Sequence, residues 1–206
     1  MRCINRLIEP TAGQVIWNDV DITSLSEEEM RRVRRKIGMV FQHFNLVHRS
    51  SVLTNVLAGR LGYVNPTWSL LNRFPKKDIE KAMQQLNRVG IADKAEQRAD
   101  ELSGGQQQRV GIARAIIQDP EMILADEPIA SLDPVQAHSI MQYLELFNRE
   151  DGVTVLCSLH FLDLLHRYAQ RVIALNEGKL VFDGAPVEID DDRFKEIYGK
   201  DAERVG

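Results

Sequence analysis

Residues 102–133 read LSGGQQQRVGIARAIIQDPEMILADEPIASLD and predict a helix followed by a short buried strand. Apolar residues recur at helical spacing over residues 104–118, which gives that helix one buried stripe. Asp119-Pro120 ends the helix, because the residue before a proline is pushed out of the helical region. Residues 122–125 are apolar on both faces, which is typical of a central strand in a parallel sheet covered by helices. The stretch therefore favours an α/β fold.

The start of the predicted helix has two interpretations. Ser103, Gly104, Gly105 and Gln106 place two glycines and a hydroxyl where the first backbone N–H groups lack intrahelical acceptors. Such a helix start carries partial positive charge, and glycines let a phosphate approach the backbone closely. The alternative is an ordinary glycine-rich loop with Ser103 as the N-cap. The strand with two acids about one helix later favours the phosphate interpretation.

Two acids follow the predicted strand directly. Asp126 and Glu127 occupy its carboxyl end, which is where ligands of parallel sheets bind. A carboxylate at this place can hold magnesium, either directly or through water. The adjacent Glu127 can polarise a water for in-line attack on a γ-phosphate. The alternative is a pair of solvated acids without a function, which the flanking motifs disfavour.

These features together resemble the nucleotide-binding subunit of ABC transporters. Residues 102–106, the strand with its acids, and the turn at residues 131–133 follow the order of that family's signature, Walker B strand and D-loop. The resemblance implies that the signature and Asp133 contact nucleotide, that Asp126 holds Mg²⁺ and that Glu127 is the general base. It also implies ATP and Mg²⁺ as ligands and a P-loop NTPase-like (RecA-like) fold.

Two further residues at predicted strand ends extend the resemblance. Gln42 follows an apolar strand at residues 37–41 and resembles the Q-loop glutamine, which reaches the magnesium and the attacking water. His160 follows a strand at residues 153–157 and resembles the switch histidine, whose imidazole would bond the γ-phosphate and orient Glu127. At the strand end that carries the histidine, the family more often has Thr-Ser-His, whereas this chain has Cys-Ser-Leu-His at residues 157–160.

Composition limits the classes of function. The 206 residues are 44% hydrophobic and 27% charged, which suits one substantial domain with a soluble surface. The net charge of −4 gives no general case for nucleic-acid binding. Cys3 and Cys157 lie far apart without metal-ligand spacing, which fits a reduced cytosolic compartment. No apolar run approaches the ~20 residues that span a bilayer, and no secretory signal is visible, so we expect any membrane role to be peripheral.

We expect a single domain over residues 1–206, with a mostly parallel sheet core and a helical subdomain. The core comprises residues 1–43 and 102–206, and the subdomain comprises residues 44–101. The N-terminal part is predicted to hold the tail of a helix at residues 1–7, an antiparallel hairpin about Asn18-Asp19 and a helix with a Ser26 capping box. Further helices are predicted at residues 77–89, 134–149, 161–168 and 194–198, and a second hairpin at 171–176 and 179–183.

The sequence contains no Gly-x-x-x-x-Gly-Lys-Ser/Thr phosphate loop. Its two Gly-Lys pairs, at residues 178–179 and 199–200, are followed by leucine and aspartate. In the family this loop lies just upstream of the segment that resembles residues 1–7. We therefore expect a cassette truncated at its N-terminus, or a coding sequence whose start has been placed at an internal methionine. Paired with an intact subunit, such a chain could still present its signature to the partner's nucleotide.

Within the family, residues 41–62 (FQHFNLVHRSSVLTNVLAGRLG), with Trp68 and Phe74-Pro75 after them, look most like phosphonate importers. The resemblance implies an ATP-hydrolysing subunit that energises import of a small solute. The implied partners are a second ATP-binding subunit, transmembrane permease subunits and, indirectly, a periplasmic solute-binding protein, at the cytoplasmic face of the inner membrane. Three alternatives stay open: an importer of amino acids such as methionine, a soluble ABC ATPase without a transporter, and a truncated cassette that does not hydrolyse ATP.

Overall fold

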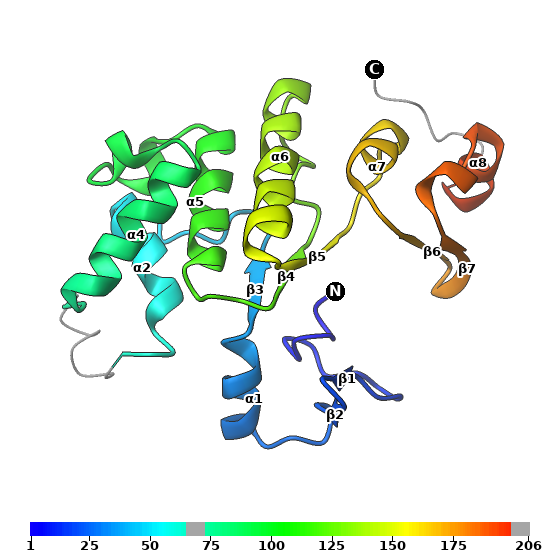
Figure 1. Cartoon of the computed structure of the whole chain (residues 1–206), viewed down its shortest axis with the longest axis horizontal. Helices are drawn as coiled ribbons and strands as arrows, with labels where there is room; N and C mark the ends of the chain where they lie inside the picture. Colours follow the sequence, from blue (N-terminus) through cyan, green and yellow to red (C-terminus); the bar gives the residue numbers. More distant parts are fainter. Residues whose placement is uncertain (65–72, 199–206) are drawn as a thin grey trace. The chain divides into compact units, whose positions relative to one another are not determined.

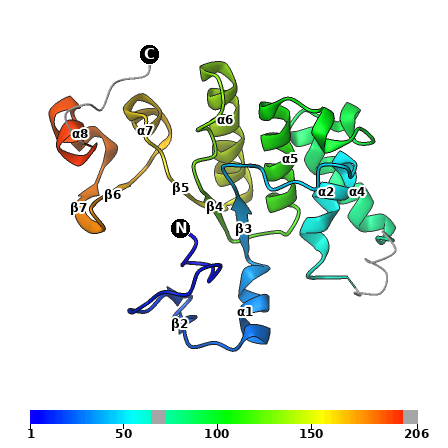
Figure 2. The same cartoon turned by 180° about the vertical axis from the view of Figure 1, so that it is seen from behind.

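The computed structural model describes residues 1–64 and 73–198 (Figure 1, Figure 2). Trp68 and most of the segment around it lie outside these residues. The chain divides into two compact units, Met1–Ser158 and the residues from Leu159 onward. The expected helical subdomain at residues 44–101 falls within the first unit, and its boundary stays a prediction.

The first unit holds three strands of a parallel sheet, an antiparallel hairpin and most of the helices. Its elements are, in chain order, β1 (Ile16–Trp17), β2 (Val20–Asp21), α1 (Glu27–Arg34), β3 (Ile37–Val40), α2 (Val52–Leu57), η1 (Ala58–Arg60), α4 (Lys76–Arg88), η2 (Ala92–Lys94), η3 (Ala99–Glu101), α5 (Gly104–Ile116), β4 (Met122–Ala125), α6 (Pro134–Asp151) and β5 (Thr154–Cys157).

The parallel sheet has the strand order β3-β4-β5, with β4 in the centre. Ile123, Leu124 and Ala125 of β4 are completely buried, as expected of a strand covered on both faces. In the register, Val40 pairs with Ala125, and Ala125 pairs with Cys157. The carboxyl ends of the three strands therefore lie level at one edge of the sheet, as the sequence predicts.

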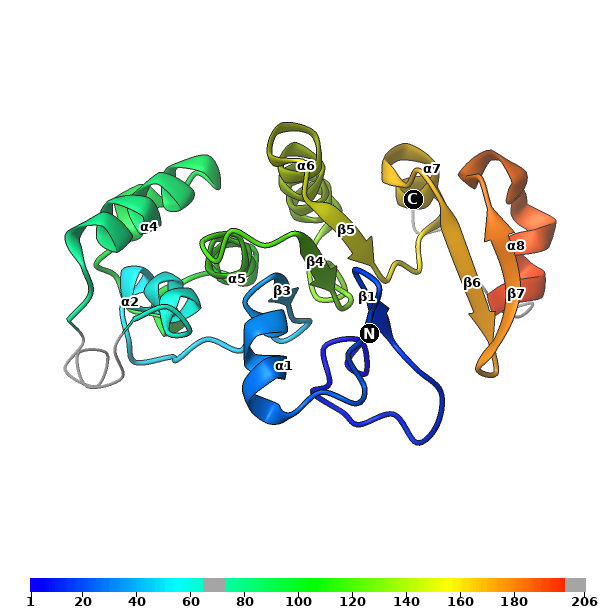
Figure 3. The same cartoon turned by 60° about the horizontal axis from the view of Figure 1, so that its bottom comes forward.

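Helices α5 and α6 cover one face of the sheet. α5 contacts β3, α6 contacts β5, and the two helices contact each other (Figure 3). Right-handed crossovers between successive parallel strands place both helices on the same face. Gly38 allows the close approach of α5, because a Cβ there would lie 3.1 Å from the Ala115 carbonyl oxygen.

The other face of the sheet is covered by the N-terminal segment. Ile37, Met39 and Leu124 form a buried cluster against which Met1 and Ile4 pack. The predicted helix tail at residues 1–7 is wrong, because residues 2–6 form turns. The backbone at Arg6 has a φ of 51°, a left-handed conformation that cannot continue an α-helix. The apolar residues read as a helical face instead reach the sheet from these turns.

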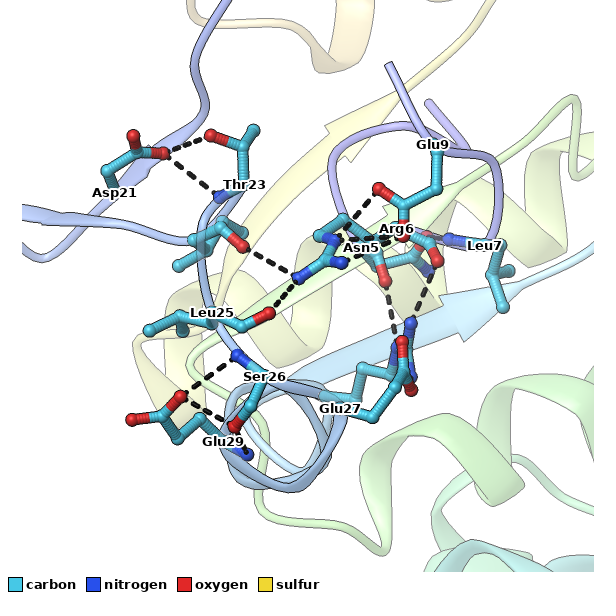
Figure 4. Close-up of polar contacts among 12 residues, drawn as sticks. Asn5, Arg6, Leu7, Glu9, Asp21, Thr23, Leu25, Ser26, Glu27 and Glu29 are labelled. Atoms are coloured by element: carbon cyan, nitrogen blue, oxygen red, sulfur yellow. Dashed lines mark hydrogen bonds and ion pairs between the residues drawn. The ribbon is translucent and has the colours of Figure 1, made fainter. Parts of the chain in front are cut away.

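The Arg6 guanidinium holds the N-terminal segment in place (Figure 4). It donates to the carbonyl oxygens of Ile22 at 3.2 Å and Leu25 at 2.7 Å, and it pairs with Glu9 at 2.8 Å. Arg34 of α1 donates to the carbonyl oxygens of the same segment, including that of Arg6 at 2.8 Å. These bonds tie the segment to the connection between β2 and α1.

The helices α2, η1 and α4 pack together against α5. Gly59 lies at the tightest point of this contact, since a Cβ there would lie 2.3 Å from the Arg114 carbonyl oxygen. Arg60 and Asp78 form an ion pair of 3.1 Å between η1 and α4, and their side chains are only 12% and 4% exposed. Glycine packing thus fixes this helical part onto α5, and the buried ion pair holds η1 and α4 together.

The second unit contains α7 (Leu162–Tyr168), β6 (Val172–Asn176), β7 (Lys179–Gly184), η4 (Pro186–Glu188) and α8 (Asp191–Tyr198). β6 and β7 form the predicted antiparallel hairpin, with positive φ at Glu177 and Gly178 in its turn. Leu165, Phe182 and Phe194 belong to the core of this unit. No helix in residues 1–64 and 73–198 has both the length and the apolar character needed to cross a bilayer.

Candidate functional site

Three of the predicted site residues, Gln42, Asp126 and Glu127, lie just past the ends of β3 and β4. The Asp126 N–H donates to the Val40 carbonyl oxygen at 2.9 Å, so the first acid continues the parallel pairing of the two strands. Gln42 comes two residues after the last residue of β3. Gln42 and Asp126 are both partly buried. The fold therefore places Gln42, Asp126 and Glu127 at the same edge of the sheet, and their roles at this edge stay predictions.

Glu127 adopts a backbone conformation that is rare for its residue type. Its φ is 46°, in the left-handed region. The Glu127 N–H donates to the Ser158 hydroxyl at 2.8 Å, and this hydroxyl donates to the Ala125 carbonyl oxygen at 3.4 Å. On the other side, the Gln108 side-chain amide donates to the Pro128 carbonyl oxygen at 2.7 Å. Neighbouring elements thus hold the acid on both sides, in a conformation that the chain alone would not prefer.

Asp126 is paired with a cation within the chain. The Arg2 Nε donates to Asp126 Oδ2 at 3.2 Å, and the Asp126 side chain is 22% exposed. Among the described residues, no group of three or more His, Cys, Asp or Glu side chains could hold a metal ion. One carboxylate with a nearby amide suits Mg²⁺, which is commonly held by one or two carboxylates together with waters and substrate phosphates.

The signature residues form a complete N-terminal cap of α5. The Ser103 hydroxyl accepts from the Gln106 N–H at 3.4 Å, and the Ser103 N–H donates to Gln106 Oε1 at 3.0 Å. This is a capping box, so Ser103 is an N-cap in this structure. The cap leaves the amides of Gly104 and Gly105 in the first turn, where helical N–H groups have no intrahelical acceptors. Capping and phosphate binding are therefore compatible.

The two signature glycines pack against the D-loop and the segment after Gln42. A Cβ at Gly104 would meet side chains of Leu132 and Phe44 at 3.6 Å, which is ordinary contact. A Cβ at Gly105 would lie 1.9 Å from the Gln136 Oε1. The Asp133 carboxylate caps α6 by accepting from the Gln136 N–H at 2.9 Å. The signature and Asp133, both predicted at the nucleotide, therefore lie close together in the first unit.

His160 belongs to the second unit, one residue after that unit begins, and its side chain is exposed. Its assignment as a switch residue stays a prediction from the sequence, and so does its contact with Glu127.

Four residues that contact the site did not emerge from the sequence analysis: Arg2, Gln108, Arg114 and Ser158. Arg114 of α5 donates to the carbonyl oxygens of Phe44, at 2.8 Å, and Asn45. Burial lowers the pKa of Arg114. Polar residues within the buried helix at residues 104–118 are the one signal that could have pointed to Gln108 and Arg114. The pairing of Arg2 with Asp126 spans 124 residues, and no local pattern announces it.

Comparison with known proteins agrees with this geometry. A sequence model of the ABC transporter family matches residues 1–130. The chain is 50% identical over 200 residues to the phosphonates import ATP-binding protein PhnC 3 of Halalkalibacterium halodurans. The aligned residues are 97% of this chain and 78% of that protein. It is 52% identical over 210 residues to the phosphonates import ATP-binding protein PhnC of Staphylococcus aureus strain USA300. This alignment covers 100% of this chain and 81% of that protein.

Solved structures also resemble it. The dimeric, post-hydrolysis ATP-binding cassette MJ0796 bound to ADP and Pi matches with a TM-score of 0.77 and 33% identity, over 90% of this chain and 78% of that chain. The protein cbiO1 of Clostridium perfringens, part of the ABC transporter complex cbiONQ, matches with a TM-score of 0.76 and 27% identity, over 98% of this chain and 74% of that chain.

Proposed function

Since this chain belongs to the ABC transporter family, we propose that it is the ATP-binding subunit of an importer for phosphonates. The fold is that of an ATP-binding cassette, as the sequence predicts. The observation that carries the choice of solute is the 50–52% identity, over 97–100% of this chain, to proteins named for phosphonate import. Both of these relatives are named for phosphonate import, and neither is named for amino-acid import.

We assign the chemistry to the predicted residues. Asp126, with Gln42, would hold Mg²⁺ against the phosphates, and Mg²⁺ supplies neutralisation of the charge that develops on the terminal phosphate. Glu127 accepts a proton from the attacking water, and His160 orients the γ-phosphate. The level strand ends and the fixed backbone of Glu127 support this assignment, because general-base catalysis needs a carboxylate in one defined position.

The signature acts on a second nucleotide. We propose that Ser103, Gly104, Gly105 and Gln106 offer first-turn amides to the γ-phosphate bound by a partner subunit, with Asp133 beside them. A dimeric relative bound to ADP and Pi supports a paired arrangement. A relative within a transporter complex supports permease partners. The subunit would then bind peripherally at the cytoplasmic face of the inner membrane, with a periplasmic solute-binding protein delivering the phosphonate.

The test is ATP hydrolysis by the chain reconstituted with permease, solute-binding protein and an intact cassette, whose own phosphate loop binds the nucleotide that this chain's signature is proposed to face. We expect methylphosphonate to stimulate hydrolysis and methionine to have no effect. Equal responses to the two solutes, or no response to either, would rule out the proposed solute.

Two variants separate the contributions of the chain. Gly104→Asp brings a carboxylate to the phosphate approach, and Gly104→Ala is its matched control because that position has room for a Cβ. We expect Gly104→Asp, but not Gly104→Ala, to remove stimulation of the partner's nucleotide site. Glu127→Gln reports on the chain's own site, where loss of a general base lowers turnover at that site by about 10²–10⁴-fold. If ATP hydrolysis by the reconstituted transporter falls in Gly104→Asp but is unchanged in Glu127→Gln, this subunit does not itself hydrolyse ATP.

A further inference from the structure

The signature helix α5 carries two polar side chains whose hydrogen bonds lead away from the helix. Gln108 is completely buried, and Arg114 is largely desolvated, as the lowering of its pKa by burial reflects. Both donate to backbone carbonyl oxygens in loops that follow strands of the sheet. These loops come 20 residues after Gln108 and 70 residues before Arg114 in the sequence.

Gln108 holds the loop of the proposed general base. Its Nε2 donates to the Pro128 carbonyl oxygen at 2.7 Å, one residue after Glu127. Glu127 itself has a φ of 46°, a conformation that persists in a non-glycine residue only when its surroundings impose it. Ser158 holds the Glu127 N–H from the side of β5. The hydrogen bonds with Ser158 and Gln108 therefore fix the peptide groups immediately before and after the one that joins Glu127 to Pro128.

The amide of Gln108 that makes this bond also carries a destabilising group. The Gln108 Oε1 is buried and has no hydrogen-bond partner among the described residues. A buried acceptor without a partner destabilises the folded state, and an apolar side chain of the same size would avoid this penalty. A residue whose sole role is to fill the core would be better as methionine. The glutamine at this buried position is thus explained by the hydrogen bond from its Nε2 to the Pro128 carbonyl oxygen.

Arg114 does the same for the loop after Gln42. Its guanidinium donates to the carbonyl oxygens of Phe44 and Asn45, whose φ values are 61° and 48°. These two residues form a left-handed turn, which an asparagine adopts fairly readily but a phenylalanine does not favour. Gly111 lies near both contacts, since a Cβ there would be 3.9 Å from Gln108 Oε1 and from the Phe44 carbonyl oxygen that Arg114 binds. One helix thus holds both loops.

We propose that Gln108 and Arg114 are positioning residues for ATP hydrolysis, which tie the signature helix to the loops that carry Glu127 and Gln42 of the same subunit. The proposal rests on the proposed function for the roles of Glu127 and Gln42. It adds that the helix offered to the partner's nucleotide also sets the geometry of the chain's own site. Neither residue touches nucleotide in this scheme.

Amide hydrogen exchange of the purified chain tests the contacts without any need for activity. Gln108→Met keeps the volume of the side chain and removes the donor. We expect exchange of the protected amides at residues 127–132 to become about fivefold faster, the factor for loss of one buried hydrogen bond, while the thermal midpoint stays within about 2 °C. Gln107→Met is the matched control, because Gln107 donates to the Leu102 carbonyl oxygen at 3.0 Å in the same helical turn. It should leave residues 127–132 unchanged.

Arg114→Lys tests the second contact, with Arg114→Met as the more severe variant. A lysine keeps the charge but cannot reproduce the two-pronged guanidinium geometry. We expect faster exchange at residues 42–47 in both variants, with the smaller change in the lysine variant. The proposal would be overturned if amide exchange at residues 127–132 in Gln108→Met were as slow as in the wild type. It would also be overturned if exchange at residues 42–47 were unchanged in both arginine variants.

The reconstituted transporter supplies a functional readout. In hydrolysis that depends on Glu127, we expect Gln108→Met to lower kcat about tenfold with KM for ATP within about twofold, because a loosened general base affects the reaction and not nucleotide binding. Unchanged kcat for Gln108→Met, alongside loss of activity in Glu127→Gln, would refute the positioning role alone. Insensitivity to Glu127→Gln would refute the proposed general base, and the exchange experiment would still decide whether Gln108 holds the loop.

Discussion

The buried ion pair of Arg60 and Asp78 provides a test of how η1 and α4 of the helical part are held together. Arg60 Nε lies 3.1 Å from Asp78 Oδ1, and the side chains are 12% and 4% exposed. Removing one partner of a buried pair typically costs about 3–5 kcal/mol, because the other charge remains buried. In Asp78→Ala, Arg60 still stacks on Tyr63 at 4.1 Å and lies 3.8 Å from Asp119. We therefore expect the lower end of that range, about 3 kcal/mol.

Thermal and denaturant unfolding, followed by circular dichroism, measures this loss. For a chain of 206 residues, about 3 kcal/mol corresponds to a fall in Tm of roughly 6–12 °C. The matched control is the exposed pair of Glu28 and Arg32, whose side chains are 77% and 70% exposed. Glu28→Ala should cost no more than about 0.5 kcal/mol, as exposed i,i+4 pairs do.

A double variant separates pairing from packing. Replacing both charges, in Arg60→Met with Asp78→Leu, removes the desolvation cost of both groups and often restores stability. We expect the double variant to recover at least half of the loss seen in Asp78→Ala. A loss in Asp78→Ala as small as that in Glu28→Ala, or a double variant less stable than Asp78→Ala, would show that the buried charge does not determine the stability here.

Three further perturbations follow from particular contacts. Gly59→Ala places a Cβ 2.3 Å from a backbone oxygen of α5 and should cost about 2 kcal/mol or more, whereas Gly111→Ala, with its nearest neighbours at 3.9 Å, should not destabilise in the same denaturation assay. Ser158→Ala leaves the Glu127 N–H without its acceptor and should cost about 1–3 kcal/mol in unfolding free energy, together with lower turnover. Burial raises the pKa of Cys157 to about 12, so the thiol should resist alkylation at about pH 8.5 in the folded chain. Because the folded pKa is above the unfolded value of about 8.5, stability should fall between about pH 9 and 12, and Cys157→Ala should reduce that fall.

Local sequence patterns predicted the elements whose causes are local. Ser26 starts a helix with a capping box, which forms as expected. A capping box also forms at Ser103, where the sequence offered an N-cap only as the alternative interpretation. Both ends of the strand Met122–Ala125 are predicted correctly, because an apolar run bounded by a proline and two acids leaves few other places for the strand to begin and end. The rule that ligands bind at the carboxyl ends of parallel strands is then sufficient to predict that Gln42 and the acids lie near one another.

Patterns misled where tertiary contacts decide the backbone. The apolar residues of the first turn read as a helical face, but Met1 and Ile4 reach the sheet from turns. Nothing in the residues around Glu127 announces its left-handed φ, because that conformation depends on hydrogen bonds from Gln108 and Ser158. A sequence can indicate which acid acts on a water, whereas the orientation of that acid is a property of the helix and strand packed beside it.

The two signature glycines illustrate the same limit. From the sequence, Gly104 and Gly105 share one reason to be glycine, namely close approach of a phosphate. The structure separates them: position 104 has room for a Cβ, whereas a Cβ at position 105 would lie 1.9 Å from the Gln136 Oε1 within the same chain. A Cβ at position 105 would therefore displace the Gln136 side chain of α6, directly after the D-loop. Because a change at Gly105 also disturbs this packing, a substitution at Gly104 tests phosphate approach more cleanly than one at Gly105.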